Sequence, residues 1–168
     1  MSRLMRLDEV DLEMLASYVD SPDYGAAYFE PATGQVYPAF YGEVLGEDGE
    51  PIDLDDVDWR SLGGSSRAAY ADMERFADAI SDPAIAGRLW SALGGKGSFR
   101  RFGDVVHRQP EELGRAWQRY GDLRSTVRAV EWLDGEGLLA ETEAAERVQL
   151  LEQQALAVLA AVSRRGLR

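Results

Sequence analysis

The stretch from Gly94 to Gly103 constrains the fold more than any other part of this sequence. It reads Gly-Gly-Lys-Gly-Ser-Phe-Arg-Arg-Phe-Gly, and its first three glycines interrupt an otherwise helical pattern. Glycine ends helices because it adopts left-handed backbone conformations without steric cost. Serine is a preferred N-cap, so Ser98 is placed to cap the following helix. We therefore expect one helix to end near Gly94 and another to begin at Ser98.

Apolar residues recur at helical spacing on both sides of this hinge. Before it, Asp82-Pro83 is typical of a helix start, and we expect Trp90 to join the core formed by that helix. After it, Phe99 and Phe102 are three residues apart and therefore lie on one side of the second helix. We expect both phenylalanines to be buried.

The N-terminal third of the chain predicts one helix and a β-hairpin. Asp8 is a suitable cap for a helix that runs to about Asp20. Two β-prone runs within residues 26–41 flank the turn sequence Pro-Ala-Thr-Gly, residues 31–34, which is typical of a hairpin. Pro38 cannot donate a hydrogen bond to a neighbouring strand, so the second strand is expected at a sheet edge.

The rest of the chain is predicted to be helical. Capping residues and apolar stripes indicate helices from Ser65 or Ser66 to Ile80, from Pro110 to about Leu133, and over 139–165. The sequence thus predicts an α+β fold, in which an N-terminal helix and a β-hairpin pack with a mainly α-helical C-terminal portion. Its 168 residues fit a single domain, 1–168.

Composition narrows the classes of function. The chain has no cysteine, which excludes thiol catalysis, disulfides and thiolate metal sites. No signal-peptide pattern and no long apolar run occur, so we expect a cytoplasmic protein with no membrane contact. Of the 30 acidic residues, 15 lie in residues 1–60, where only 3 of the 18 basic residues occur, so this third carries the net charge of −12. An acidic protein is poorly suited to non-specific binding of duplex nucleic acid.

Residues 43–58 hold eight acidic side chains. A calcium loop is not indicated, because Val57 stands where a third ligand is needed and the required glycine is missing. We interpret this segment as a solvated acidic loop and expect no metal site and no cofactor.

The C-terminal helix, 139–165, has apolar residues that alternate at spacings of four and three, in the order Ala144, Val148, Leu151, Ala155, Val158 and Val162. This pattern allows two arrangements. The stripe either packs against its own domain or forms a homodimer contact. Arg164, Arg165 and Gly166 are typical of a helix C-terminus.

Several of these motifs together resemble the bacterial uncharacterised protein family 0158, over about residues 7–138. The motifs are Tyr28 to Tyr37 with its Thr33-Gly34 turn, Tyr70-x-x-Met73-x-x-Phe76, Leu89 to Phe102 with the glycine hinge and Phe-Arg-Arg-Phe, Trp117, and Trp132-Leu133. The hinge is the most specific part. The resemblance implies an α+β fold, and it implies no established activity and no catalytic residues.

Positive charge at the start of the second hinge helix indicates an anion-binding point. Helix N-termini are already electropositive, so Lys96, Arg100 and Arg101 are expected to attract a negative group. Together with the backbone at Gly97 and Ser98, they form our predicted anion site. That anion is either an internal carboxylate, from Glu30 or residues 43–58, or an external phosphate or carboxylate.

Catalytic motifs are weak by comparison. Gly95-Lys96-Gly97 lacks the Ser or Thr that directly follows Gly-Lys in a phosphate-binding loop. His107 lies one helical turn after Asp104, an arrangement that would suit a general base, but we favour its interpretation as a partly exposed histidine near a helix end. We identify no catalytic residue. Our sequence-based expectation is a non-catalytic interaction or regulatory module, with RNA, nucleotide or phosphate binding at residues 94–101 as the alternative and a hydrolase as a third reading.

Overall fold

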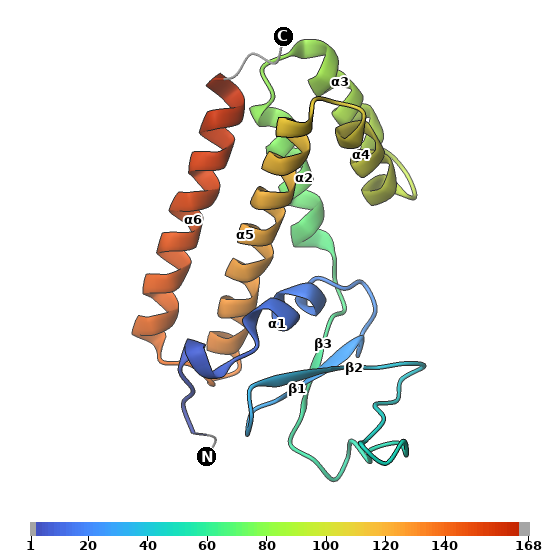
Figure 1. Cartoon of the computed structure of the whole chain (residues 1–168), viewed down its shortest axis with the longest axis vertical. Coiled ribbons are helices and arrows are strands. Elements are labelled where there is room, and N and C mark those ends of the chain that lie inside the picture. The colour runs from blue at the N-terminus through green and yellow to red at the C-terminus, as the bar shows by residue number, and fades with distance from the viewer. Residues whose placement is uncertain (1–2, 165–168) are drawn as a thin grey trace. The chain divides into compact units, whose positions relative to one another are not determined.

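The computed structural model describes residues 3–164 (Figure 1), so the expected helix end at Arg165 and Gly166 lies outside the described residues. The chain has the predicted α+β fold, with a three-stranded antiparallel sheet followed by a mainly helical C-terminal part. It divides into two compact units. The sheet unit comprises residues 3–66 and 125–149, and the helical unit comprises residues 67–124 and 150–164.

The sheet unit is built around the predicted hairpin. Strand β1, Ala27–Glu30, pairs antiparallel with β2, Gln35–Pro38, and Gly34 closes the turn with a φ of +77°. The sheet order is β2-β1-β3, so Pro38 does lie in an edge strand. Strand β3, Arg60–Leu62, was not predicted, because three residues are too few to show an alternating pattern and their pairing partner is distant in sequence.

The N-terminal helix starts later than expected. Helix α1 spans Leu12–Val19, and its cap is Asp11, whose carboxylate accepts a hydrogen bond from the amide of Met14 at 3.2 Å. The cap assigned to Asp8 is therefore wrong. Asp8 lies instead in a short 3₁₀ helix, Leu7–Glu9, because the Glu9 carboxylate accepts the amide of Arg6 at 2.8 Å and closes a turn there.

The sheet unit is completed by the second half of α5, Glu111–Gly135, and the first turns of α6, Glu141–Arg164. Phe29 of β1 is fully buried and packs edge-on against Trp132 of α5, with the ring centroids 5.5 Å apart. Arg128 makes a two-point ion pair with Asp20, with both N–O distances at 2.6 Å. The acidic segment 43–58 is largely exposed and irregular, as predicted, and Asp48 and Asp53 accept amides of their own turns.

The helical unit contains α2, Arg67–Ala79, α3, Pro83–Ala92, and α4, Ser98–His107, with the first half of α5 and the last part of α6. Asp82 caps α3 as predicted, accepting amides of Ala84 and Ile85. The core of this unit is an aromatic cluster whose ring centroids lie 4.9–6.5 Å apart, made of Phe76, Phe102, Trp117 and Tyr120.

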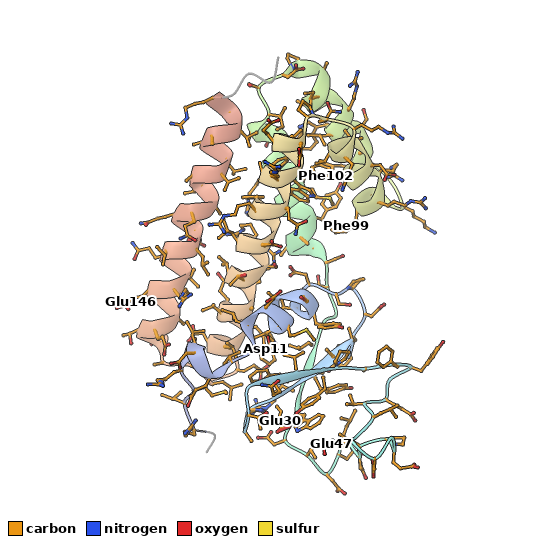
Figure 2. The ribbon with its side chains drawn as sticks, viewed as in Figure 1. Asp11, Glu30, Glu47, Phe99, Phe102 and Glu146 are labelled. Atoms are coloured by element: carbon orange, nitrogen blue, oxygen red, sulfur yellow. The ribbon has the colours of Figure 1, made fainter. Side chains whose placement is uncertain are left out.

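Two aromatic residues expected in this core are not in it. Phe102 is fully buried, but Phe99 is 46% exposed and Trp90 is 42% exposed. Phe99 and Phe102 are labelled in Figure 2. The spacing of three places Phe99 at the margin of the apolar face of α4, whose buried residues are Ser98, Phe102 and Val106. The small side chain of Ser98 thus takes the inward position in the first turn, and Phe99 is left beside it at the surface.

Candidate functional site

The hinge between α3 and α4 is held by its own arginine. Helix α3 ends at Ala92, and Gly95 and Gly97 then adopt left-handed conformations, with φ of +72° and +75°. The guanidinium group of Arg101 donates hydrogen bonds to the carbonyls of Gly94 and Lys96. These carbonyls follow a helix C-terminus, where backbone acceptors lack helical partners. Arg101 therefore fastens the turn.

Within the described residues, the other members of the predicted anion site form no side-chain hydrogen bond or ion pair with one another. Ser98 is buried and is the first residue of α4, so it is not the N-cap. Gly97 is the N-cap, because the tight reversal needs a left-handed residue at that position, and it provides no side-chain cap. Lys96 and Arg100 are exposed, and within residues 3–164 neither side chain makes a hydrogen bond or ion pair.

A groove between α3 and α4 is also lined by positive charge. Its volume is about 750 Å³, and its walls carry Arg88 of α3 and Arg101 and Arg108 of α4, against one acid, Asp104. In the described part of the chain, Arg88, Arg108 and Asp104 form no ion pair and no side-chain hydrogen bond. We call this groove the arginine groove. Two of its three arginines and its one carboxylate thus have no ion-pair partner within the described residues.

Small residues form the α3 side of the arginine groove. Ala84, Gly87 and Ser91 line it, and none of its lining residues is aromatic. Phe99 precedes Arg101 by two residues, which is roughly 200° around a helix, so it faces away from the groove. A peptide backbone or a small polar group could therefore come close to α3. The groove has no aromatic ring on which a nucleobase could stack.

The sequence singled out one of the three groove arginines. Arg101 was in the predicted site, and its spacing to Asp104 and Arg108 could have revealed one charged helix face. Arg88 could not have been added, because its place beside α4 depends on how the two helices pack.

The histidine hypothesis gains no support from the geometry. His107 is exposed, and its Nδ1 lies 2.6 Å from the carbonyl oxygen of Gly103, to which it must donate. Asp104 lines the arginine groove instead. No hydrogen bond or ion pair joins Asp104 to His107 in the described residues.

A second polar cluster lies inside the helical unit and was missed by the sequence analysis. Asp72 of α2 is 2% exposed; its carboxylate lies 3.2 Å from Arg124 Nε and 3.6 Å from an Arg75 nitrogen. Burial raises the pKa of the Tyr120 phenol above its usual range, and the negative charge of Asp72 adds to this effect. The signal in the sequence is a charged residue beside Met73 in an apolar stripe.

This cluster borders a groove of about 280 Å³ that Leu156 and Leu159 also line. Its charges are mutually compensated, since Arg124 also lies 3.8 Å from Glu152. The cluster therefore joins α2, α5 and α6 within the unit, and it offers no surplus charge to a ligand.

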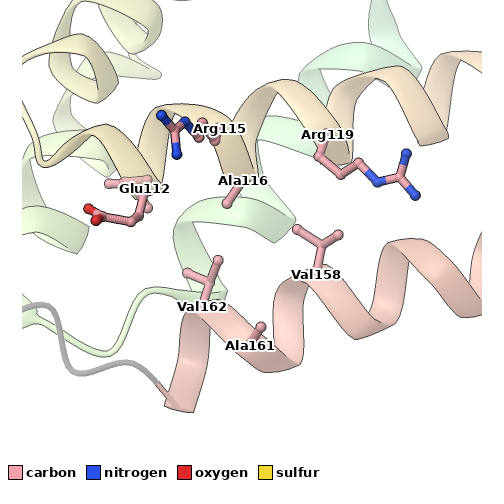
Figure 3. A pocket seen from close by; sticks show the side chains of 8 residues that line it. Glu112, Arg115, Ala116, Arg119, Val158, Ala161 and Val162 are labelled. Carbon is pink, nitrogen blue, oxygen red and sulfur yellow. The ribbon is translucent and has the colours of Figure 1, made fainter.

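A third groove is apolar and lies between α5 and α6 (Figure 3). Its volume is about 260 Å³, with Ala116 on one wall and Val158 and Ala161 on the other. Arg115 and Arg119 stand on its α5 side. We call it the α5–α6 groove.

Two other kinds of site are absent from residues 3–164. No group of three or more His, Cys, Asp or Glu residues is arranged to hold a metal ion there. None of the described helices is long and apolar enough to cross a membrane.

The fold and its grooves define an α+β protein whose helical unit bears an arginine-lined surface groove. Residues 66–154 match the model of a family described as Uncharacterised protein family (UPF0158). These 89 residues (154 − 66 + 1) are more than half of the 168-residue chain, so the protein belongs to this family. No curated protein and no solved structure matched the chain.

The matched span differs from the span of the resemblance seen in the sequence. It begins after the hairpin and extends beyond residue 138 into α6. It includes the hinge, all three groove arginines and Asp72, so the candidate site belongs to the family region.

Proposed function

We propose that this protein is an interaction module that binds an acidic segment of a partner protein in the arginine groove. The observation that carries the proposal is the pair Arg88 and Arg108, two arginines on one groove without an ion-pair partner in the described residues. Arginine clusters recognise acidic and phosphorylated motifs because the planar guanidinium group binds carboxylates and phosphates at two points.

The shape of the groove supports a peptide in preference to a nucleic acid. Ala84, Gly87 and Ser91 would let a peptide backbone come close to α3, and no aromatic residue lines the groove to stack a base. The net charge of −12 also disfavours a long polyanion such as duplex nucleic acid.

Binding to the arginine groove is tested with a fluorescein-labelled oligoglutamate peptide of about ten residues. We expect its fluorescence anisotropy to rise with protein concentration and its affinity to fall as salt is added, because exposed charges are screened. Arg88→Ala with Arg108→Ala should weaken binding by about tenfold or more. The matched control is Arg115→Ala with Arg119→Ala, which removes the same charge from a different groove.

Direct binding of other anions separates the alternatives. Inorganic phosphate and ATP are tested by the shift they cause in the melting temperature, and a fluorescein-labelled single-stranded RNA by its own anisotropy, for the wild type and the double variant. If phosphate compounds bind at the same arginines and the peptide does not, the ligand is a phosphorylated molecule. Binding that survives loss of both arginines, or no binding by any probe, would refute the proposal.

A further inference from the structure

The outer side of α6 carries a largely apolar row of residues that the fold of this chain does not bury. The stripe predicted from the sequence faces inward, since Leu151, Ala155 and Val162 are buried in the helical unit. A second set of residues follows the same spacing of four, three and four on the outer side. This outer seam consists of Leu150, Gln154, Ala157 and Ala161, of which Leu150 is 50% exposed and Ala157 is exposed.

The outer seam ends at the α5–α6 groove. Leu150 and Ala161 are eleven residues apart, which corresponds to about 20° around the helix axis and about 16.5 Å along it. An exposed leucine and an apolar groove therefore lie on the same face of one helix. They are too far apart for Leu150 to fill the groove of its own chain.

We propose that a second copy of this chain fills the groove, through antiparallel pairing of the two α6 helices. Leu150 of each chain then inserts into the α5–α6 groove of the other, opposite Ala161. The twofold axis passes between residues 155 and 156, and Gln154 lies opposite Ala157 of the partner subunit. Both contacts occur twice, as an isologous interface requires. The small side chains of Ala157 and Ala161 let the helices come close.

Charge complementarity favours the antiparallel direction. Glu146 precedes Leu150 by one helical turn and lies on the outer side of α6 (Figure 2). In this antiparallel register Glu146 lies beside the exposed Arg164 of the partner subunit, one residue from direct opposition. Parallel pairing would bring Glu146 against its own copy and Leu150 against Leu150, and it would leave the groove unfilled. The seam is narrow, so we expect a reversible dimer whose population rises with concentration.

Cysteine cross-linking tests both the dimer and its register, because the chain has no cysteine of its own. Leu150→Cys chains mixed with Ala161→Cys chains should form a disulfide-linked dimer on mild oxidation. Leu150→Cys alone should not, since the two copies of residue 150 would be about 16.5 Å apart and a disulfide needs Cα atoms within about 7 Å. Preferential cross-linking of Leu150→Cys to itself would overturn the antiparallel register.

Sedimentation velocity on the full-length chain gives an independent readout. The mean mass should rise from that of a monomer towards that of a dimer as concentration increases, and Leu150→Lys should abolish the increase. The control is Leu156→Lys, which changes a leucine that is 66% exposed, against 50% for Leu150, and that lies about 240° around the same helix. A wild-type monomer at every concentration without the mixed cross-link, or equal effects of the two substitutions, would overturn the proposal. Neither result bears on the arginine groove, whose residues lie on α3 and α4.

Discussion

Phe99 and Phe102 show how much a side chain's contribution depends on its position in one helical turn. Phe102 touches Phe76 and Trp117, with ring centroids at 6.5 and 4.9 Å, whereas almost half of Phe99 is exposed. Hydrophobic stabilisation scales with the apolar area removed from water, so the two residues should differ strongly.

We expect Phe102→Ala to lower the free energy of unfolding by about 3–5 kcal/mol, because it leaves a cavity in the aromatic core. Phe99→Ala should cost no more than about 1.5 kcal/mol, since the residue is already partly hydrated. Urea denaturation of both variants measures the difference. Equal losses would contradict the placement of the two rings.

Substitution of the two neighbouring arginines, Arg100 and Arg101, should also change stability by different amounts. Arg101→Ala removes the donors that satisfy the carbonyls of Gly94 and Lys96, and we expect a loss of about 1 kcal/mol in stability. Arg100→Ala removes an exposed cation at a helix N-terminus and should change stability by less than about 0.5 kcal/mol, or raise it slightly. Thermal melting of both variants and of the wild type, at low and at high salt, measures these two changes in stability. Equal effects would show that Arg101 does not hold the turn.

The raised pKa of Tyr120 predicts that the stability of the protein falls at alkaline pH. Its pKa is raised in the folded state, chiefly by burial, so the folded protein keeps the phenol proton more tightly than the unfolded chain does. The corresponding stability is full below the unfolded pKa of about 10 and is lost as pH rises through that value towards the folded pKa. Tyr120→Phe cannot ionise, so its stability should fall less steeply above pH ~10. Urea unfolding at several pH values tests this, and parallel pH profiles of the two proteins would count against it.

At the scale of elements, the hairpin turn is fixed by contact with the segment before α1. Gly34 has a φ of +77°, its carbonyl accepts the amide of Asp11 at 2.9 Å, and a Cβ on it would lie 2.0 Å from the carbonyl oxygen of Glu9. Gly42 has a similar φ of +80°, but nothing lies within 4 Å of its Cβ position. Both glycines thus have a left-handed backbone conformation, but only Gly34 lacks room for a side chain.

Alanine substitutions at Gly42 and Gly34 should therefore distinguish the cost of the left-handed backbone from the cost of steric overlap with neighbouring atoms. Gly42→Ala should cost about 1–2 kcal/mol for the left-handed conformation. Gly34→Ala carries the same cost and adds about 1–3 kcal/mol, because the hairpin turn and the backbone of Glu9 and Val10 must move apart. Differential scanning calorimetry of both variants measures the comparison. If the two melting temperatures fell equally, the close approach to Glu9 would be unimportant.

For the whole molecule, α6 has a role in both units. It contributes the buried Ala144 to the sheet unit and the buried Ala155 and Val162 to the helical unit. We therefore expect deletion of residues 139–168 to abolish cooperative thermal unfolding, followed by circular dichroism, because both cores lose apolar residues. Leu156→Lys, at an exposed position on the same helix, should leave a cooperative transition. A truncated chain that still melts cooperatively would show that α6 is an accessory element.

Most of the local structure of this protein could be predicted from neighbouring residues in the chain. Helix periodicity, the Asp82-Pro83 start, the hairpin turn at residues 31–34 and the glycine hinge depend on neighbouring residues, so they can be read without knowing what packs where. The same local information indicated positive charge at the start of α4. The motifs were also sufficient to identify the family.

Tertiary structure decided which of these residues could act together. Strand β3 exists through pairing with a distant strand, and Phe99 is exposed because Ser98 and Phe102 occupy the inward positions of α4. Arg101 is engaged by the carbonyls of the hinge, while Arg88 reaches the same groove from another helix. Burial and convergence of side chains are set by contacts between residues far apart in the chain, and the spacing of residues along one helix carries no record of them.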